Sequence, residues 1–245
     1  MKLERPHPLT FAKMYWPHVN FYDLQRQLIE SVRTNRRTVV VSANTMGKDF
    51  SAAYVALSFF LCPQMWFDEA YTSQVEAVRI ANELVNPTLC GMCRGLSKRV
   101  KNCDNCLSLS YLMTHTRRIV TTSVDEKHLG TLWGEVSRYL MTCAVPLMEA
   151  QGGPLVVNDM DIRFKDEREA KRPINWLVGR VAKEKEGFQG YHGAYTLFMV
   201  DEASGMRDDV IEMAQTWSKK DLLFGNPRPC DNSFREAVRR GDIAA

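Results

Sequence analysis

The chain has 245 residues, of which 45% are hydrophobic and 25% are charged, a composition typical of a globular protein that buries a sizeable core. No apolar run reaches the roughly 20 residues that a membrane-spanning helix needs, and the N-terminal residues lack the apolar centre and cleavage site of a signal peptide. The sequence therefore excludes a membrane protein and predicts a cytoplasmic one. The net charge of +3 does not by itself indicate a nucleic-acid partner.

Apolar residues recur at spacings that predict alternating helices and strands. In chain order the pattern predicts a helix over 21–32, a strand over 37–42, a helix over 49–61, a strand over 118–122, an amphipathic helix over 127–149, a strand over 196–200, a helix over 208–216, a strand over 222–224 and a helix over 233–240. Three short strand-like pieces lie within 152–185. This alternation predicts an α/β fold with a mostly parallel sheet flanked by helices, in which ligands bind at the carboxyl ends of the strands.

The loop after the first predicted strand has the outline of a phosphate-binding loop. It reads SANTMGKD and contains Ser42, Asn44, Thr45, Met46, Gly47, Lys48 and Asp49. Backbone N–H groups in a small-residue loop before a helix cradle phosphates, and Lys48 is expected to reach the β- and γ-phosphates. The alternative is an exposed helix start that Asp49 caps.

This loop departs twice from the usual G-x-x-x-x-G-K-[ST] pattern. Ser42 replaces the first glycine, and because it lies where the strand ends, the turn is not expected to require a positive φ there. Asp49 replaces the metal-binding hydroxyl and is expected to bind Mg²⁺ directly or through water. Nucleotide binding should then depend strongly on the metal, because Asp49 without Mg²⁺ would repel the phosphates.

Polar side chains also follow two later strands. The run YTLFMVDEAS predicts a buried strand that delivers Asp201 and Glu202 to the sheet edge, where Asp201 would hold Mg²⁺ and Glu202 would polarise an attacking water. Asn226 follows the strand in LLFGNPRP and is the candidate sensor of the γ-phosphate. The alternatives are a strand that merely ends in acidic residues and an ordinary Asn-Pro turn.

Four of the seven cysteines form the pattern C-x2-C-x9-C-x2-C, namely Cys90, Cys93, Cys103 and Cys106. In a cytoplasmic chain this pattern predicts a zinc ion, with an iron–sulfur site or free thiols as the alternatives. Four thiolates leave no position for a reactive water, so the metal is predicted to be structural.

With these motifs in place, the chain resembles the ATPase domain of the large terminase subunit, the DNA-packaging motor of tailed bacteriophages. The resemblance rests on the order FYDLQRQ, SANTMGKD, RRIVTTSVDEKHLGTLWGEVSRYL, EGFQGYHG, DEASG and LLFGNPRPCDNSF. It covers roughly residues 20–61 and 117–240. The segment over 62–116, with its four cysteines, is then an insertion between two parts of a P-loop ATPase core.

The resemblance implies roles for further residues. Gln25 would read adenine, with Tyr22 beside it as a stacking candidate. Lys48 would be the phosphate-loop lysine, Asp201 the metal carboxylate, Glu202 the catalytic carboxylate and Asn226 the coupling residue. Motors of this kind take an arginine from a neighbouring subunit. EGFQGYHG contains no arginine, so Arg180 is the first candidate and Arg163 the second.

The resemblance also implies a function and partners. ATP hydrolysis, with Mg²⁺, would drive double-stranded viral DNA into a procapsid in the cytoplasm of the infected bacterial host. The partners would be DNA, the portal and the small terminase subunit, and the assembled chain would form a homo-oligomeric ring, with a monomer possible in isolation. Basic residues of the insertion, Arg94, Lys98, Arg99 and Lys101, would contact DNA or the portal, unless the insertion is only a metal-stabilised excursion.

Two other interpretations stay open. DEAS also resembles the DEAD box of superfamily 2 helicases, although such an enzyme needs a second RecA-like domain. A large terminase would continue into a nuclease domain, and no DNA-cleaving activity is expected of this chain. From a different class, the chain could be a non-hydrolysing zinc module that binds DNA or the portal.

Overall fold

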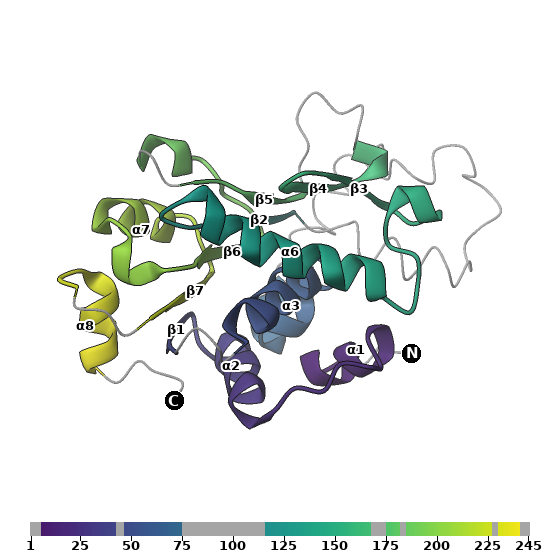
Figure 1. Cartoon of the computed structure of the whole chain (residues 1–245), viewed down its shortest axis with the longest axis horizontal. Coiled ribbons are helices and arrows are strands. Elements are labelled where there is room, and N and C mark those ends of the chain that lie inside the picture. The colour runs from purple at the N-terminus through teal and green to yellow at the C-terminus, as the bar shows by residue number, and fades with distance from the viewer. Residues whose placement is uncertain are drawn as a thin grey trace.

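A seven-stranded sheet runs through the molecule with helices on both of its faces (Figure 1). The computed structural model describes residues 6–42, 47–74, 116–167, 175–181, 185–226 and 230–240. The strands are β1 (Arg37–Val41), β2 (Arg117–Thr122), β3 (Leu155–Asn158), β4 (Asp161–Phe164), β5 (Trp176–Gly179), β6 (Tyr195–Val200) and β7 (Lys220–Gly225).

The order of the strands is β1-β7-β6-β2-β5-β4-β3. Neighbours from β1 to β5 are parallel, whereas β5, β4 and β3 pair in antiparallel fashion. The predicted α/β fold with a mostly parallel sheet is thus confirmed. Because β7 and β6 lie between β1 and β2, the carboxyl ends of β1, β7 and β6 are neighbours, although they are far apart in the sequence.

Each face of the sheet has its own apolar core. Four helices share one core: α1 (Pro8–Tyr15), α2 (Asp23–Thr34), α3 (Lys48–Leu61) and α6 (Glu126–Thr142). The helices α7 (Asp208–Gln215) and α8 (Ser233–Arg240) share the other. Side chains of a strand alternate between the two cores, so that Leu197 and Met199 face the first and Phe198 and Val200 the second.

Short 3-10 helices connect several of these elements. They are η1 (Pro63–Trp66), η2 (Glu149–Gln151), η3 (Lys165–Glu167), η4 (Lys185–Phe188) and η5 (Ala203–Gly205). The predicted strands and most predicted helices agree with the structure to within two residues. The sequence pattern did not predict α1.

The helix predicted over 127–149 is wrong at its end, because α6 stops at Thr142. Pro146 has no N–H for a helix and disfavours helical geometry at the residue before it. The N–H of Ala144 donates to the Tyr15 carbonyl, 2.7 Å away, instead of continuing the helix. The chain that follows α6 therefore contacts the end of α1.

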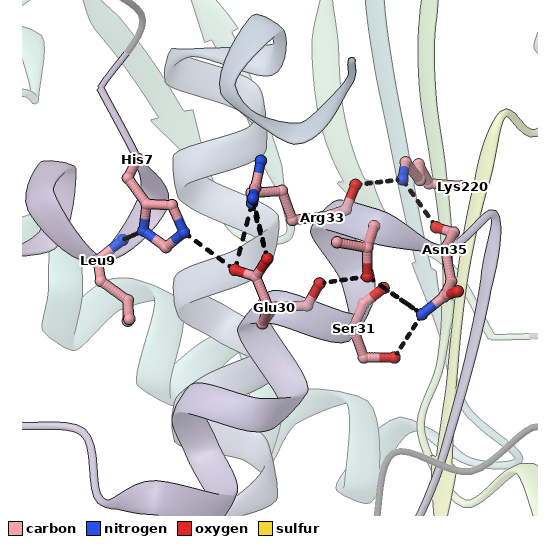
Figure 2. A network of polar contacts seen from close by, with 8 residues as sticks. His7, Leu9, Glu30, Ser31, Arg33, Asn35 and Lys220 are labelled. Carbon is pink, nitrogen blue, oxygen red and sulfur yellow. Dashed lines mark hydrogen bonds and ion pairs between the residues drawn. The ribbon is translucent and has the colours of Figure 1, made fainter.

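Polar contacts join α2 to its neighbours at the amino end of the sheet (Figure 2). His7 Nε2 lies 2.9 Å from Glu30 Oε2, and Arg33 Nε donates to the same carboxylate. Lys220 Nζ, at the start of β7, donates to the carbonyls of Arg33 at 2.8 Å and Asn35 at 2.7 Å. The lysine thus caps the carboxyl end of α2 and fixes it on the sheet.

Several predicted site residues lie outside the described part of the chain. These are Asn44, Thr45 and Met46 of the phosphate loop and Cys90, Cys93, Cys103 and Cys106 of the zinc motif. Their roles stay predictions, as do the bounds of the insertion. Its described beginning packs on the core, since Met65 and Trp66 are buried there. In the described ranges no helix is long and apolar enough to cross a membrane.

Candidate nucleotide-binding site

The end of the phosphate loop requires glycine at position 47. Gly47 has a φ of +64°, the left-handed region that other residues rarely adopt, and directly precedes α3. A Cβ atom at this position would also lie 2.8 Å from Gln25 Nε2. The positive φ favours glycine here and the Gln25 amide would have to move to admit a Cβ atom, so the backbone geometry at this point matches the sequence motif.

The other end of the loop continues the sheet. The N–H of Ser42 donates to the Gly225 carbonyl at 3.1 Å, which extends the pairing of β1 with β7 by one bond. In the described residues only Asp159 and Glu202 are non-glycine residues with positive φ, so Ser42 needs no glycine-like backbone. Its hydroxyl is buried without a hydrogen-bond partner. A buried hydroxyl of this kind is a candidate contact for a ligand.

Lys48, Asp201, Glu202 and Asn226 converge at the carboxyl ends of β6 and β7. Lys48 Nζ lies 2.9 Å from Glu202 Oε1 and 3.4 Å from Asp201 Oδ1. Asn226 Nδ2 donates to the same Glu202 Oε1 at 2.8 Å. Exposure is 6% for Lys48, 2% for Asp201, 4% for Glu202 and 7% for Asn226. The four predicted residues therefore form one buried, hydrogen-bonded cluster.

The electrostatics of the cluster follow from burial and close charges. Burial disfavours the charged form of Lys48, but the hydrogen bond to Glu202 and the negative charges of Asp201, Glu202 and Asp49 together raise its pKa. Burial raises the pKa of Asp201, and the attraction of Lys48 only partly opposes it. The lysine thus stays charged and holds two carboxylates where water has little access.

Asp49 lies beside this cluster in the first turn of α3. Its Oδ1 atom is buried without a hydrogen-bond partner. Burial, and then the charges of Asp201, Glu202 and Glu135, raise the pKa of Asp49 to about 6, against a lowering by Lys48. Buried carboxylate oxygens of this type suit Mg²⁺.

The structure does not itself assemble a metal centre from these residues. In the part of the chain it describes, no group of three or more His, Cys, Asp or Glu side chains is arranged to hold a metal ion. The assignment of Asp49 and Asp201 as Mg²⁺ ligands therefore stays a prediction. Orphaned buried oxygens on Asp49, Ser42 and Asn226 fit the requirement for a polar ligand at this edge.

Gln25 and Tyr22 lie next to the loop at the start of α2. Gln25 is buried, its Oε1 accepts from the Tyr22 N–H at 3.3 Å, and its Nε2 donates to the Gly47 carbonyl at 3.5 Å. The Tyr22 ring is 43% exposed. Gln25 links the starts of α2 and α3, and its role in reading adenine stays a prediction.

The two candidate arginines differ in their surroundings. Arg180 directly follows β5, is exposed, and its guanidinium lies 6.0 Å from the centre of the Tyr191 ring. It is at the same carboxyl edge as the cluster, with β2 between its own strand and β6. Arg163 on β4 donates to Asp161 at 2.8 Å. The Arg163 side chain is 41% exposed but is paired with Asp161, so Arg180 stays the first candidate for an arginine that serves a neighbouring subunit.

Sequence reasoning missed two residues near the site. Glu135 on α6 contributes to the field at Asp49, and Asn232 donates to the turn after Glu202. Neither Glu135 nor Asn232 was assigned a role in any of the sequence motifs. The helical period of α6 indicates which residues face the core, but no sequence signal places Glu135 opposite Asp49.

Comparisons with known proteins bear on the fold. No family model and no curated protein matches this sequence. A variant of the large terminase ATPase domain of Thermus phage P74-26 is similar in structure, with a TM-score of 0.52 and 13% identity over 95% of this chain and 74% of that one. The large terminase of bacteriophage HK97 gives 0.49 and 11% identity, and the match spans 91% of this chain but 38% of that protein.

At 13% identity the similarity to the Thermus phage domain concerns architecture rather than chemistry. It agrees with the resemblance that the motifs indicated independently. The described chain has the fold of a phage large terminase ATPase domain.

Proposed function

We propose that this protein is a P-loop ATPase that drives translocation of double-stranded viral DNA into a procapsid. The observation that carries the proposal is the cluster of Lys48, Asp201, Glu202 and Asn226 on adjacent strand ends, next to the glycine turn that starts α3. A lysine at a helix start, a pair of carboxylates and a polar sensor are the parts that phosphoryl transfer needs. The similarity of the fold to that of a phage large terminase ATPase domain also supports the proposal.

Each residue has a defined part in the proposed reaction. Lys48 would leave Glu202 and contact the β- and γ-phosphates, which frees the carboxylate to orient the attacking water and accept its proton. Asp49 and Asp201 would hold Mg²⁺. That ion would supply positive charge that stabilises the negative charge of the phosphates. Asn226, which contacts Glu202 in this structure, would register loss of the γ-phosphate.

The proposal extends to assembly. Arg180 would reach the γ-phosphate of a neighbouring copy in a ring, because it is exposed at the edge where the nucleotide binds. DNA, the portal and the small terminase subunit are the proposed partners. The insertion would be a zinc-stabilised subdomain built on Cys90, Cys93, Cys103 and Cys106.

The test is ATP turnover by the purified protein, with and without linear double-stranded DNA. Wild type should release phosphate. Glu202→Gln should retain nucleotide binding and lose at least about 100-fold in turnover, since it removes the proton acceptor. Lys48→Ala should lose both nucleotide binding and ATP turnover. Equal turnover by wild type and Glu202→Gln would reject the proposed site.

Arg180 needs a mixing experiment, because its proposed role is in a neighbouring subunit. Arg180→Ala subunits should regain turnover when mixed with Glu202→Gln subunits, since an intact site then faces an intact arginine. No recovery at concentrations that support assembly would reject Arg180 as the trans-acting arginine. Arg163→Ala serves as the comparison and should turn over ATP without being mixed with a second variant.

A further inference from the structure

Asn232 lies just before α8, and its side chain contacts the turn that follows Glu202. We infer that Asn232 is a positioning residue for hydrolysis, which holds the η5 turn and through it the backbone of Glu202. The inference rests on the proposed function, and within the described residues no hydrogen bond given for the Asn232 side chain reaches the Lys48 cluster.

One amide group binds three carbonyls of this turn. Asn232 Nδ2 lies 3.0 Å from the Ala203 oxygen, 3.2 Å from that of Ser204 and 3.1 Å from that of Met206. The amide has two hydrogens, so the three acceptors share them. Three carbonyl dipoles that converge on one point repel each other unless a donor lies between them. Removal of Nδ2 would therefore loosen the turn.

Asn232 is itself held in place by α8. Its Oδ1 accepts from the Arg235 N–H at 3.3 Å, and its carbonyl accepts from the Glu236 N–H at 3.2 Å, which makes it the N-cap of the helix. The next N–H, of Ser233, donates to Asp208 Oδ1 at 2.7 Å. Phe234 anchors the helix in the core beneath. The side-chain amide that binds the turn is thus held in place by α8, which is packed on the core.

The turn needs such support because Glu202 has an unusual backbone. Its φ is +52°, in the left-handed region that a non-glycine residue adopts only at a cost in free energy. The Gly205 N–H donates to the Glu202 carbonyl at 2.9 Å and closes the turn. Gly225 of β7 packs against it, since a Cβ there would lie 3.1 Å from the Ala203 nitrogen. Contacts from β7 and from Asn232 therefore fix the direction of the Glu202 side chain.

These contacts separate positioning of Glu202 from nucleotide binding. Lys48 and Gly47 belong to the start of α3, whereas Asn232 contacts α8 and the turn after β6. A shift of the turn would misplace the carboxylate that orients the water and leave the phosphate contacts unchanged. The expected signature is a lower kcat with an unchanged KM for ATP.

The test uses substitutions that keep the helix cap. Asn232→Ser retains an acceptor for the Arg235 N–H but loses the Nδ2 donor, and kcat should fall about tenfold while KM stays within about twofold. Asn232→Asp also keeps the cap but places an oxygen against three carbonyls, and its kcat should fall further. Asn35→Ser is the matched control, because its Nδ2 donates to the Ser31 carbonyl at the opposite edge of the sheet.

An unchanged kcat in Asn232→Ser, or an equal fall in Asn35→Ser, would overturn the inference while the ATPase proposal stands. A wild-type protein without ATP turnover would overturn both. If Asn232→Ser does not fold, Asn232→Thr, which also caps helices, takes its place, and the Gly205 amide should exchange hydrogen faster in the folded variant than in wild type.

Discussion

Lys48 Nζ lies 2.9 Å from Glu202 Oε1, so the lysine that should bind phosphate neutralises the carboxylate that should activate water. Asn226 donates to the same oxygen. Two donors therefore occupy Glu202 Oε1, which weakens the carboxylate as an acceptor for a proton from water. A ligand with phosphate charge would compete with Glu202 for Lys48, which links nucleotide binding to release of the carboxylate.

The buried ion pair of Lys48 and Glu202 should make substitutions at these two residues strongly destabilising. Lys48→Met leaves Asp201 and Glu202 buried without their cation and should cost roughly 3–5 kcal/mol of unfolding free energy. The double variant Lys48→Met/Glu202→Gln should recover part of this loss, because one uncompensated charge is removed. Urea unfolding of the two single variants and the double variant measures the coupling. Purely additive losses would show that the pair does not interact.

Asp49 should make stability depend on pH in the acidic range. Its folded-state pKa of about 6 lies above the ordinary 3.8, so the folded protein binds more protons than the unfolded chain between those values. Its contribution to stability is present below about pH 4 and is lost as pH rises to 6. Asp49→Asn should therefore exceed wild type by on the order of 1–2 kcal/mol at pH 7 and match it near pH 4. Denaturant unfolding of wild type and Asp49→Asn at pH 4 and at pH 7 measures this difference.

The same residue should set the metal dependence of nucleotide binding. Asp49→Thr restores the usual hydroxyl and should keep much of the ATP turnover, whereas Asp49→Ala should lose most of it. Without Mg²⁺ the wild type should bind nucleotide more weakly than Asp49→Thr, because the carboxylate repels phosphate. Titration of a fluorescent ATP analogue with and without Mg²⁺ measures this. Full activity of Asp49→Ala would reject Asp49 as a ligand of Mg²⁺.

Lys220 should make stability depend on pH in the alkaline range. Burial lowers its pKa to about 8 from 10.5, although Nζ donates to the carbonyls of Arg33 and Asn35 (Figure 2). Between those values the unfolded chain binds more protons, so this group makes the protein more stable as pH rises through 8 toward 10. The rise should amount to about 1–3 kcal/mol and be absent in Lys220→Met. Lys219→Met, at an exposed neighbour, should keep the wild-type slope.

Zinc content tests the part of the chain that the sequence alone describes. Protein purified without chelators should carry one zinc per chain by atomic emission. Replacement of Cys90 and Cys93 by serine should remove the metal. If zinc is structural, ATP turnover should survive in the folded variant, since four thiolates leave no site for a reactive water. A chain that contains iron and absorbs visible light would instead indicate an iron–sulfur site.

The local features of the site were predictable from sequence because each depends on neighbouring residues. A glycine before Lys48 permits the left-handed turn found at the start of α3, and the apolar run before Asp201 favours a buried strand. The end of α6 was missed although Pro146 marks it in the sequence, and the contact between Ala144 and Tyr15, which also turns the chain away, joins residues that are far apart in the chain.

The sequence by itself determined which residue types follow which strands, and hence an α/β fold with Lys48, Asp201, Glu202 and Asn226 as its candidate site. Only the tertiary structure decided that these four meet, since the strand order β1-β7-β6 brings together ends that lie some 150 residues apart. It also decided that Asn232 supports the turn of Glu202 and that Asp49 is buried beside other carboxylates. Hydrogen bonds and desolvation depend on distances in space, which no spacing along the chain specifies.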